Sequence, residues 1–198
     1  ERPAEGNAGA GMGCTVGKIL GLKQAMKSGI GTASVDLGGG AVVGAIVAVN
    51  AFGDVVENGK IIAGARAADL GPLHLGAPGY FADTLTVMKS LVGKTIMAFA
   101  SKANTVIGVV ATNAKLSKEE ANKVAQMAHD GLARVIRPAH TMLDGDTIFA
   151  LATGDKTVDV NIVGAYAAEA VAQAILNGVR AAEPVAGLPS AGRMTKDG

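Results

Sequence analysis

Residues 103–113 read Ala-Asn-Thr-Val-Ile-Gly-Val-Val-Ala-Thr-Asn, and the fold is organised around this stretch. Its β-branched run from Val106 to Val110 has the length and composition of a buried strand. Asn104 and Thr105 stand immediately before that run, where a loop passes into the strand. The pair has two interpretations, a polar strand entrance or a hydroxyl held for chemistry, and on its own it leaves both open.

The composition predicts a single domain with a core of small aliphatic side chains. The chain has 198 residues, of which 49% are hydrophobic and only 3% aromatic, with 28 glycines. Its 18 basic and 17 acidic residues give a net charge of +1, which argues against a nucleic-acid partner. No apolar run approaches the roughly 18 residues of a membrane span. The single cysteine, Cys14, excludes an internal disulfide and favours a reducing, cytoplasmic location.

Glycines crowd the N-terminal segment before Lys18. The segment is not a phosphate loop, because Met12 stands where that motif needs its first glycine, and Ile19 follows Lys18 in place of Ser or Thr. A dinucleotide-binding fingerprint is excluded as well, because no strand precedes the glycines. Lys18 is therefore either a solvated loop lysine or a site residue carried by a tight glycine turn.

Hydrophobic periodicity and turn residues predict the remaining elements. Residues 29–53 read as two strands joined at 38–40, and Asn50 ends the second strand, either as a turn residue or as an amide donor to a site. Ser117 and Glu120 form a capping box that begins a helix, which Pro138 ends. We also expect a helix within 80–91, strands at 95–100 and 147–152, a helix at about 158–181 and a loose tail after Pro184.

An acidic turn, Asp144-Gly145-Asp146, precedes the predicted strand at 147–152. The turn is either an ordinary Asp-Gly loop or a pair of site carboxylates. It does not form a calcium loop, because no further carboxylates follow at the positions that would complete one. His140 has no partner histidine or cysteine at ligand spacing, so we expect no metal and no other cofactor.

Five segments of the sequence, taken in order, resemble those of one known family. They are residues 6–18, 29–33, 47–55, 104–113 and 140–154. Together they resemble the self-cleaving L-aminopeptidase/D-esterase family, whose members include β-aminopeptidases and the endo-type nylon-oligomer (6-aminohexanoate-oligomer) hydrolase. The resemblance covers nearly all of the chain, and it matches only the later part of a family member.

This resemblance implies an α+β fold, a four-layer αββα sandwich like that of the N-terminal-nucleophile hydrolases. It also implies that a precursor cuts itself between Asn104 and Thr105. Residues 1–104 would then end the large subunit, and residues 105–198 would form a small subunit that stays attached to it. The family further implies a homo-oligomer, a tetramer or larger, that acts on a small amide or peptide, with no nucleic-acid or membrane partner.

The family's functional positions carry over onto this sequence residue by residue. Thr105 matches the nucleophile, and its α-amine, once cleavage frees it, would serve as the base with a reference pKa near 8. Asn50 matches the asparagine that stabilises the oxyanion. Lys18, Asp144 and Asp146 match a lysine and two acids of the nylon-oligomer hydrolase, where the acids would orient the Thr105 amine.

Two alternatives to an amide hydrolase stay open at this point. One is an acyltransferase similar to the ornithine acetyltransferases, which also cleave before a Thr but have a different motif around it. The other is an inactive paralogue with a binding or structural role. The sequence departs from the aminopeptidase members, which have Ser and Glu in place of the two acids and Ser as the nucleophile.

Overall fold

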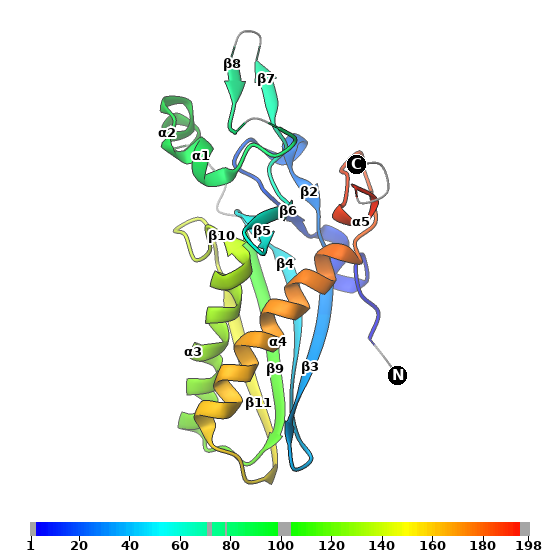
Figure 1. The fold of residues 1–198 in the computed structure, drawn as a ribbon, viewed down its shortest axis with the longest axis vertical. Helices are drawn as coiled ribbons and strands as arrows, with labels where there is room; N and C mark the ends of the chain where they lie inside the picture. The colour runs from blue at the N-terminus through cyan, green and yellow to red at the C-terminus, as the bar shows by residue number, and fades with distance from the viewer. Residues whose placement is uncertain (1–2, 71–72, 78, 99–103, 195–198) are drawn as a thin grey trace.

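The predicted strand after Thr105 lies inside a four-stranded sheet. The computed structural model describes residues 3–70, 73–77, 79–98 and 104–194. The strand order is β11-β9-β4-β3, in which β11 runs parallel to β9 and the other neighbours are antiparallel. The bounds are β3 Ile30–Gly38, β4 Ala41–Asn50, β9 Thr105–Ala114 and β11 Thr147–Lys156. The predicted hairpin at 29–53 and the strands predicted after Thr105 and at 147–152 are confirmed (Figure 1).

Two long helices cover one face of this sheet, α3 (Lys118–Val135) and α4 (Val160–Arg180) (Figure 1). α3 begins at the predicted capping box, in which the Ser117 and Glu120 side chains each accept a backbone N–H from the other residue. α4 approaches β3 so closely that a Cβ on Gly31 would lie 2.1 Å from the carbonyl oxygen of Ala174. The buried aliphatic core lies between these two layers and includes Val43, Val47, Val110, Leu132 and Ile175.

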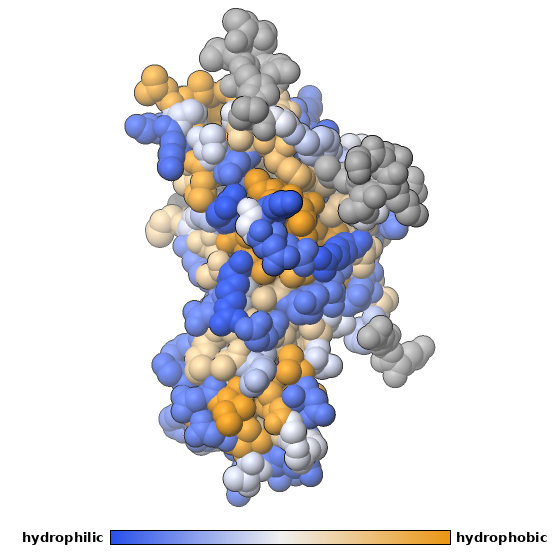
Figure 2. Space-filling view, in the orientation of Figure 1, coloured by the Kyte–Doolittle hydropathy of each residue, from blue (hydrophilic) through white to orange (hydrophobic). Residues whose placement is uncertain are grey.

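α4 also has the length and apolar composition of a membrane-spanning helix. Within its most apolar window, however, 67% of the helix is buried inside the fold. Its hydropathy is therefore that of a core helix packed between a sheet and a neighbouring helix. Figure 2 shows hydrophilic side chains over much of the face that α3 and α4 present to solvent.

The opposite face of the sheet is apolar and partly exposed. Side chains alternate between the two faces along β4 and β9, and every second one points away from the helices. On this far face five large aliphatic or aromatic side chains are between 37% and 57% exposed: Val42, Ile46, Ile107, Phe149 and Leu151. The four-layer sandwich predicted above would place a second sheet here, whereas the described residues supply one helical layer and one sheet layer.

Shorter elements gather beyond one end of the main sheet (Figure 1). They are η1 Gly9–Gly13, β1 Thr15–Val16, η2 Leu22–Gln24, β2 Met26–Lys27, β5 Asp54–Glu57, β6 Lys60–Ala63, β7 Ala68–Leu70, β8 Leu73–Leu75, α1 Thr84–Lys89, α2 Leu91–Ala98, β10 Ile136–Arg137 and α5 Ala191–Met194. The strand predicted at 95–100 is wrong over 95–98, which belong to α2, and residues 99–100 lie outside the described part of the chain. The tail predicted to be loose contains the short helix α5.

A buried lysine organises the glycine-rich segment near the N-terminus. Lys27 is 1% exposed, and its Nζ donates to the carbonyl oxygens of Gly11 (2.6 Å), Cys14 (2.9 Å) and Ser28. Burial lowers the pKa of Lys27, and the nearby Cys14 opposes that shift. These bonds fix the backbone just before Thr15, from which the chain runs on to Lys18.

Candidate active site

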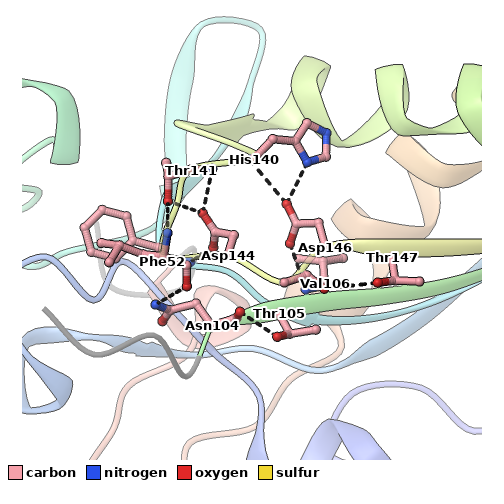
Figure 3. Close-up of polar contacts among 11 residues, drawn as sticks. Phe52, Asn104, Thr105, Val106, His140, Thr141, Asp144, Asp146 and Thr147 are labelled. Atoms are coloured by element: carbon pink, nitrogen blue, oxygen red, sulfur yellow. Dashed lines mark hydrogen bonds and ion pairs between the residues drawn. The ribbon is translucent and has the colours of Figure 1, made fainter.

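The Asn104–Thr105 peptide lies at the first residue of β9, directly across from the last residue of β4. Asn50 and Thr105 are register partners in the antiparallel pair, so their side chains share one face of the sheet. The Thr105 Oγ1 donates a hydrogen bond of 2.5 Å to the carbonyl oxygen of Asn104 (Figure 3). The backbone N–H of Gly145 donates to the same oxygen at 2.9 Å. Two donors therefore converge on the carbonyl that precedes Thr105.

Gly145 brings the acidic turn into contact with the Thr105 hydroxyl. A Cβ built on Gly145 would lie 3.0 Å from Thr105 Oγ1, tighter than an ordinary van der Waals contact. A larger residue would push the hydroxyl away from the carbonyl that it now contacts. Sequence reasoning missed Gly145, because a backbone donor leaves no signal beyond the Asp-Gly-Asp turn itself.

The Asp144 carboxylate holds this turn in place. Its Oδ1 accepts the backbone N–H of Phe52 at 3.1 Å, and its Oδ2 accepts the Thr141 hydroxyl at 2.6 Å and the Thr141 N–H at 3.2 Å (Figure 3). Asp144 also forms a parallel β-bridge with Asn104. The structure thus places Asp144 beside the peptide before Thr105, with its carboxylate bonded to the turn and to Phe52.

Asp146 lies on the other side of Gly145 and links β9 to a histidine. Its Oδ1 accepts the N–H of Val106 at 2.9 Å, and its Oδ2 contacts His140 Nδ1 at 2.9 Å (Figure 3). His140 has a left-handed backbone with φ of 54°, unusual for a residue other than glycine, and its ring lies 5.0 Å from that of His129. His140 is thus a second residue of the site that sequence reasoning did not select.

Lys18 joins the site through Asn50. Its Nζ donates to the backbone oxygen of Asn50 at 3.0 Å and to the side-chain Oδ1 at 2.6 Å, and the Thr15 N–H also donates to that Oδ1 at 3.2 Å. Because the side-chain oxygen of Asn50 accepts these hydrogen bonds, the NH₂ group of the same amide points away from Lys18. Burial lowers the pKa of Lys18 to about 8, although the nearby Cys14 and Asp144 act to raise that pKa.

All five residues selected from the sequence thus lie in one region, at the end of the β4–β9 pair. The carboxylates of Asp144 and Asp146 bond to groups around Thr105, and none of their hydrogen bonds goes to the Thr105 nitrogen. Across residues 3–70, 73–77, 79–98 and 104–194, no three His, Cys, Asp or Glu side chains are grouped so that they could hold a metal ion.

The sequence profile of peptidase family S58 matches residues 1–192. The chain belongs to peptidase family S58. An uncharacterized aminopeptidase of Mycobacterium bovis is 42% identical over 92% of this chain and 58% of its own length. A 6-aminohexanoate-oligomer endohydrolase of Paenarthrobacter ureafaciens is 28% identical over 87% of the chain and 50% of its own length. The chain therefore spans little more than half the length of these curated relatives.

Solved structures confirm the fold class of this S58 chain. A β-aminopeptidase from Burkholderia sp. matches 98% of the chain and 53% of its own chain, with a TM-score of 0.61 and 26% identity. An L-aminopeptidase D-Ala-esterase/amidase from Ochrobactrum anthropi, a variant of the Ntn hydrolase fold, matches 94% of the chain and 47% of its own, with a TM-score of 0.59 and 22% identity. The predicted α+β, Ntn-hydrolase-like fold is confirmed.

Proposed function

We propose that this S58 protein is a self-processing amide hydrolase with Thr105 as its nucleophile. The observation that carries the proposal is the convergence of the Thr105 hydroxyl and the Gly145 N–H on the carbonyl oxygen of Asn104. The hydroxyl that would attack is thus already in contact with the peptide group that it would cut. An N–H donor on that oxygen would stabilise the negative charge that attack develops there.

Self-cleavage begins when Thr105 Oγ1 attacks the carbonyl carbon of Asn104 and its proton passes to neutral Lys18. The tetrahedral carbon expels the Thr105 nitrogen, which takes up that proton, so the peptide becomes an ester on Oγ1. Water then adds to the ester and breaks its C–O bond. The products are a carboxylate on Asn104 and a Thr105 with a free hydroxyl and a free α-amine.

Lys18 is suited to the role of base before cleavage, when Thr105 has no free amine. A lysine with a pKa of about 8 has a substantial neutral fraction near neutral pH, which an ordinary lysine lacks. Its Nζ is bonded to Asn50, which lies directly across the ladder from Thr105. The NH₂ end of the Asn50 amide would then serve as a further donor to the oxyanion.

After cleavage the same hydroxyl would attack a substrate amide, with the new α-amine as its base. An acyl-enzyme forms on Oγ1, the amine product leaves, and water releases the acid. The small subunit would begin at Thr105 and remain packed against residues 1–104, in a homo-oligomer located in the cytoplasm. The names of the relatives, aminopeptidase and 6-aminohexanoate-oligomer endohydrolase, favour hydrolysis of amides over acetyl transfer.

Trapping the acyl-enzyme tests this proposal. The full-length protein is incubated with a chromogenic small-molecule anilide, quenched in acid and digested for peptide mass analysis. We expect the acyl mass on the peptide that begins at Thr105, together with a burst of the amine product. Hydrolysis of the anilide by a chain that stays uncut, or an acyl mass on another residue, would contradict the proposal.

Replacing His140 by Gly should slow self-cleavage by about tenfold, because Asp146 Oδ2 loses the His140 Nδ1 contact that helps to hold its carboxylate against the Val106 N–H. Glycine tolerates the left-handed backbone at this position, so the turn itself is kept. The matched control is His129→Ala, which removes the neighbouring ring but no bond to Asp146, and it should process within about twofold of wild type. Equal rates in all three proteins would show that His140 does not position Asp146.

A further inference from the structure

The Asn104 side chain is buried beside the carbonyl that Thr105 contacts. Asn104 is 3% exposed, and its Nδ2 donates to the carbonyl oxygen of Leu143 at 3.1 Å. Its own backbone oxygen accepts the N–H of Gly145 at 2.9 Å. The short segment 143–145 therefore forms hydrogen bonds with Asn104 at two points, its backbone carbonyl and its side-chain amide.

The acceptor on Leu143 is fixed before any substrate arrives. The turn is closed by the Asp144 N–H, which donates to Thr141 O at 3.0 Å, and by the Leu143 N–H, which donates to Thr141 Oγ1 at 3.2 Å. The Leu143 side chain packs in a second apolar cluster with Ile19 and Phe52. A carbonyl held in this way cannot easily turn toward another donor, so a group that buries it without a donor leaves it unsatisfied.

We propose that the position now filled by the Asn104 side chain is the acyl-side subsite of the mature enzyme, and that it selects acyl residues with an asparagine-like carboxamide. The proposal rests on the proposed function, in which one hydroxyl attacks both Asn104 and the substrate. In this proposal the new C-terminal residue Asn104 leaves its position after the cut, and the substrate carbonyl takes its place beside the same hydroxyl and the same Gly145 N–H. The side chain next to each carbonyl then faces the same Leu143 oxygen.

Three isosteric acyl groups separate shape from hydrogen bonding at this subsite. Asparagine presents an N–H donor to the Leu143 oxygen, leucine presents methyl groups of the same shape, and aspartate presents only acceptor oxygens. Loss of the donor leaves the buried Leu143 carbonyl unsatisfied, and a carboxylate adds repulsion. We therefore expect kcat/KM to fall in the order asparagine, leucine, aspartate.

The test uses processed wild-type protein and the N-acetyl 4-nitroanilides of asparagine, leucine and aspartate. The asparaginyl anilide should exceed the leucyl one by about tenfold in kcat/KM, and the aspartyl one should be slowest. A leucyl or aspartyl anilide that matches or exceeds the asparaginyl one would overturn the subsite. The subsite would also be overturned if a protein that has processed itself fails to cleave the asparaginyl anilide. That result would not contradict self-cleavage.

The same preference is measurable in self-cleavage, where Asn104 is itself the acyl residue. Asn104→Leu should process about tenfold more slowly than wild type, and Asn104→Asp more slowly still. The control is Met142→Leu in the same turn, where the side chain is 92% exposed, and its rate should match wild type. Wild-type speed in Asn104→Leu would refute the subsite alone, whereas a wild type that never cuts at Thr105 would remove the proposed function and the subsite together.

Discussion

The Thr105→Ala variant is expected to remain one uncut chain and to hydrolyse no amide. Alanine keeps the β9 register with Asn50 but removes the oxygen that contacts the Asn104 carbonyl. Removal of the nucleophile from a serine protease lowers kcat by about 10⁶-fold, and we expect a loss of that order here. Denaturing electrophoresis and intact mass measure the first effect, and anilide turnover measures the second.

The matched control for this variant is Thr105→Ser, which keeps the hydroxyl and loses only a methyl group. It should still cut itself and turn over substrate, because the same donors surround the oxygen. If Thr105→Ala were processed at the wild-type rate, another residue would have to supply the nucleophile. Activity in a stable, uncut Thr105→Ala protein would remove Thr105 from the mechanism altogether.

Lys18→Met should slow self-cleavage by about 10²- to 10⁴-fold, the usual contribution of a general base. Methionine keeps much of the aliphatic stem but has no proton acceptor comparable to an amine. Lys18→Arg distinguishes a role as a base from a role as a positive charge, because a guanidinium keeps the charge but stays protonated and cannot accept a proton. If Lys18 acts only through its charge, the arginine variant will process normally, and the assignment of a base will be wrong.

The pH dependence of self-cleavage should follow the Lys18 amine. Burial lowers the pKa of Lys18 to about 8, and only the neutral amine can accept the Thr105 proton. The rate should therefore rise about tenfold per pH unit below about 8 and level off above it. The rate is measured on a freshly refolded precursor from samples that are quenched at successive times. A rate of self-cleavage that decreases as the pH rises from 6 to 9 would exclude a neutral amine as the base.

The sequence predicted the scaffold of the site well, because each signal there is local. The β-branched run after Thr105 became the central strand β9, and the Ser117 capping box opened α3 as expected. Of the strand predicted at 95–100, residues 95–98 belong to α2. Ile96 and Met97 pack there against the apolar cluster around Phe52. Tertiary packing, rather than the β-propensity of the residues, therefore determines the secondary structure of this segment.

The parts of the site that the sequence did not predict depend on contacts between distant segments. Gly145 acts through its backbone N–H, and His140 joins the site through its contact with Asp146, so neither leaves a motif. The two acids were selected as partners of the Thr105 amine. In the structure Asp144 closes a turn, and Asp146 joins Val106 to His140, and only the fold could assign those contacts.

N-terminal sequencing of the purified full-length protein shows whether Thr105 becomes the first residue of a new chain. We expect a second N-terminal sequence, Thr-Val-Ile-Gly-Val, that appears with time in wild type and matches residues 105–109. The same sample should contain a partner fragment whose last residue is Asn104. An active protein with no N-terminus at Thr105, or a cut at any other bond, would rule out self-cleavage before Thr105 as the source of activity.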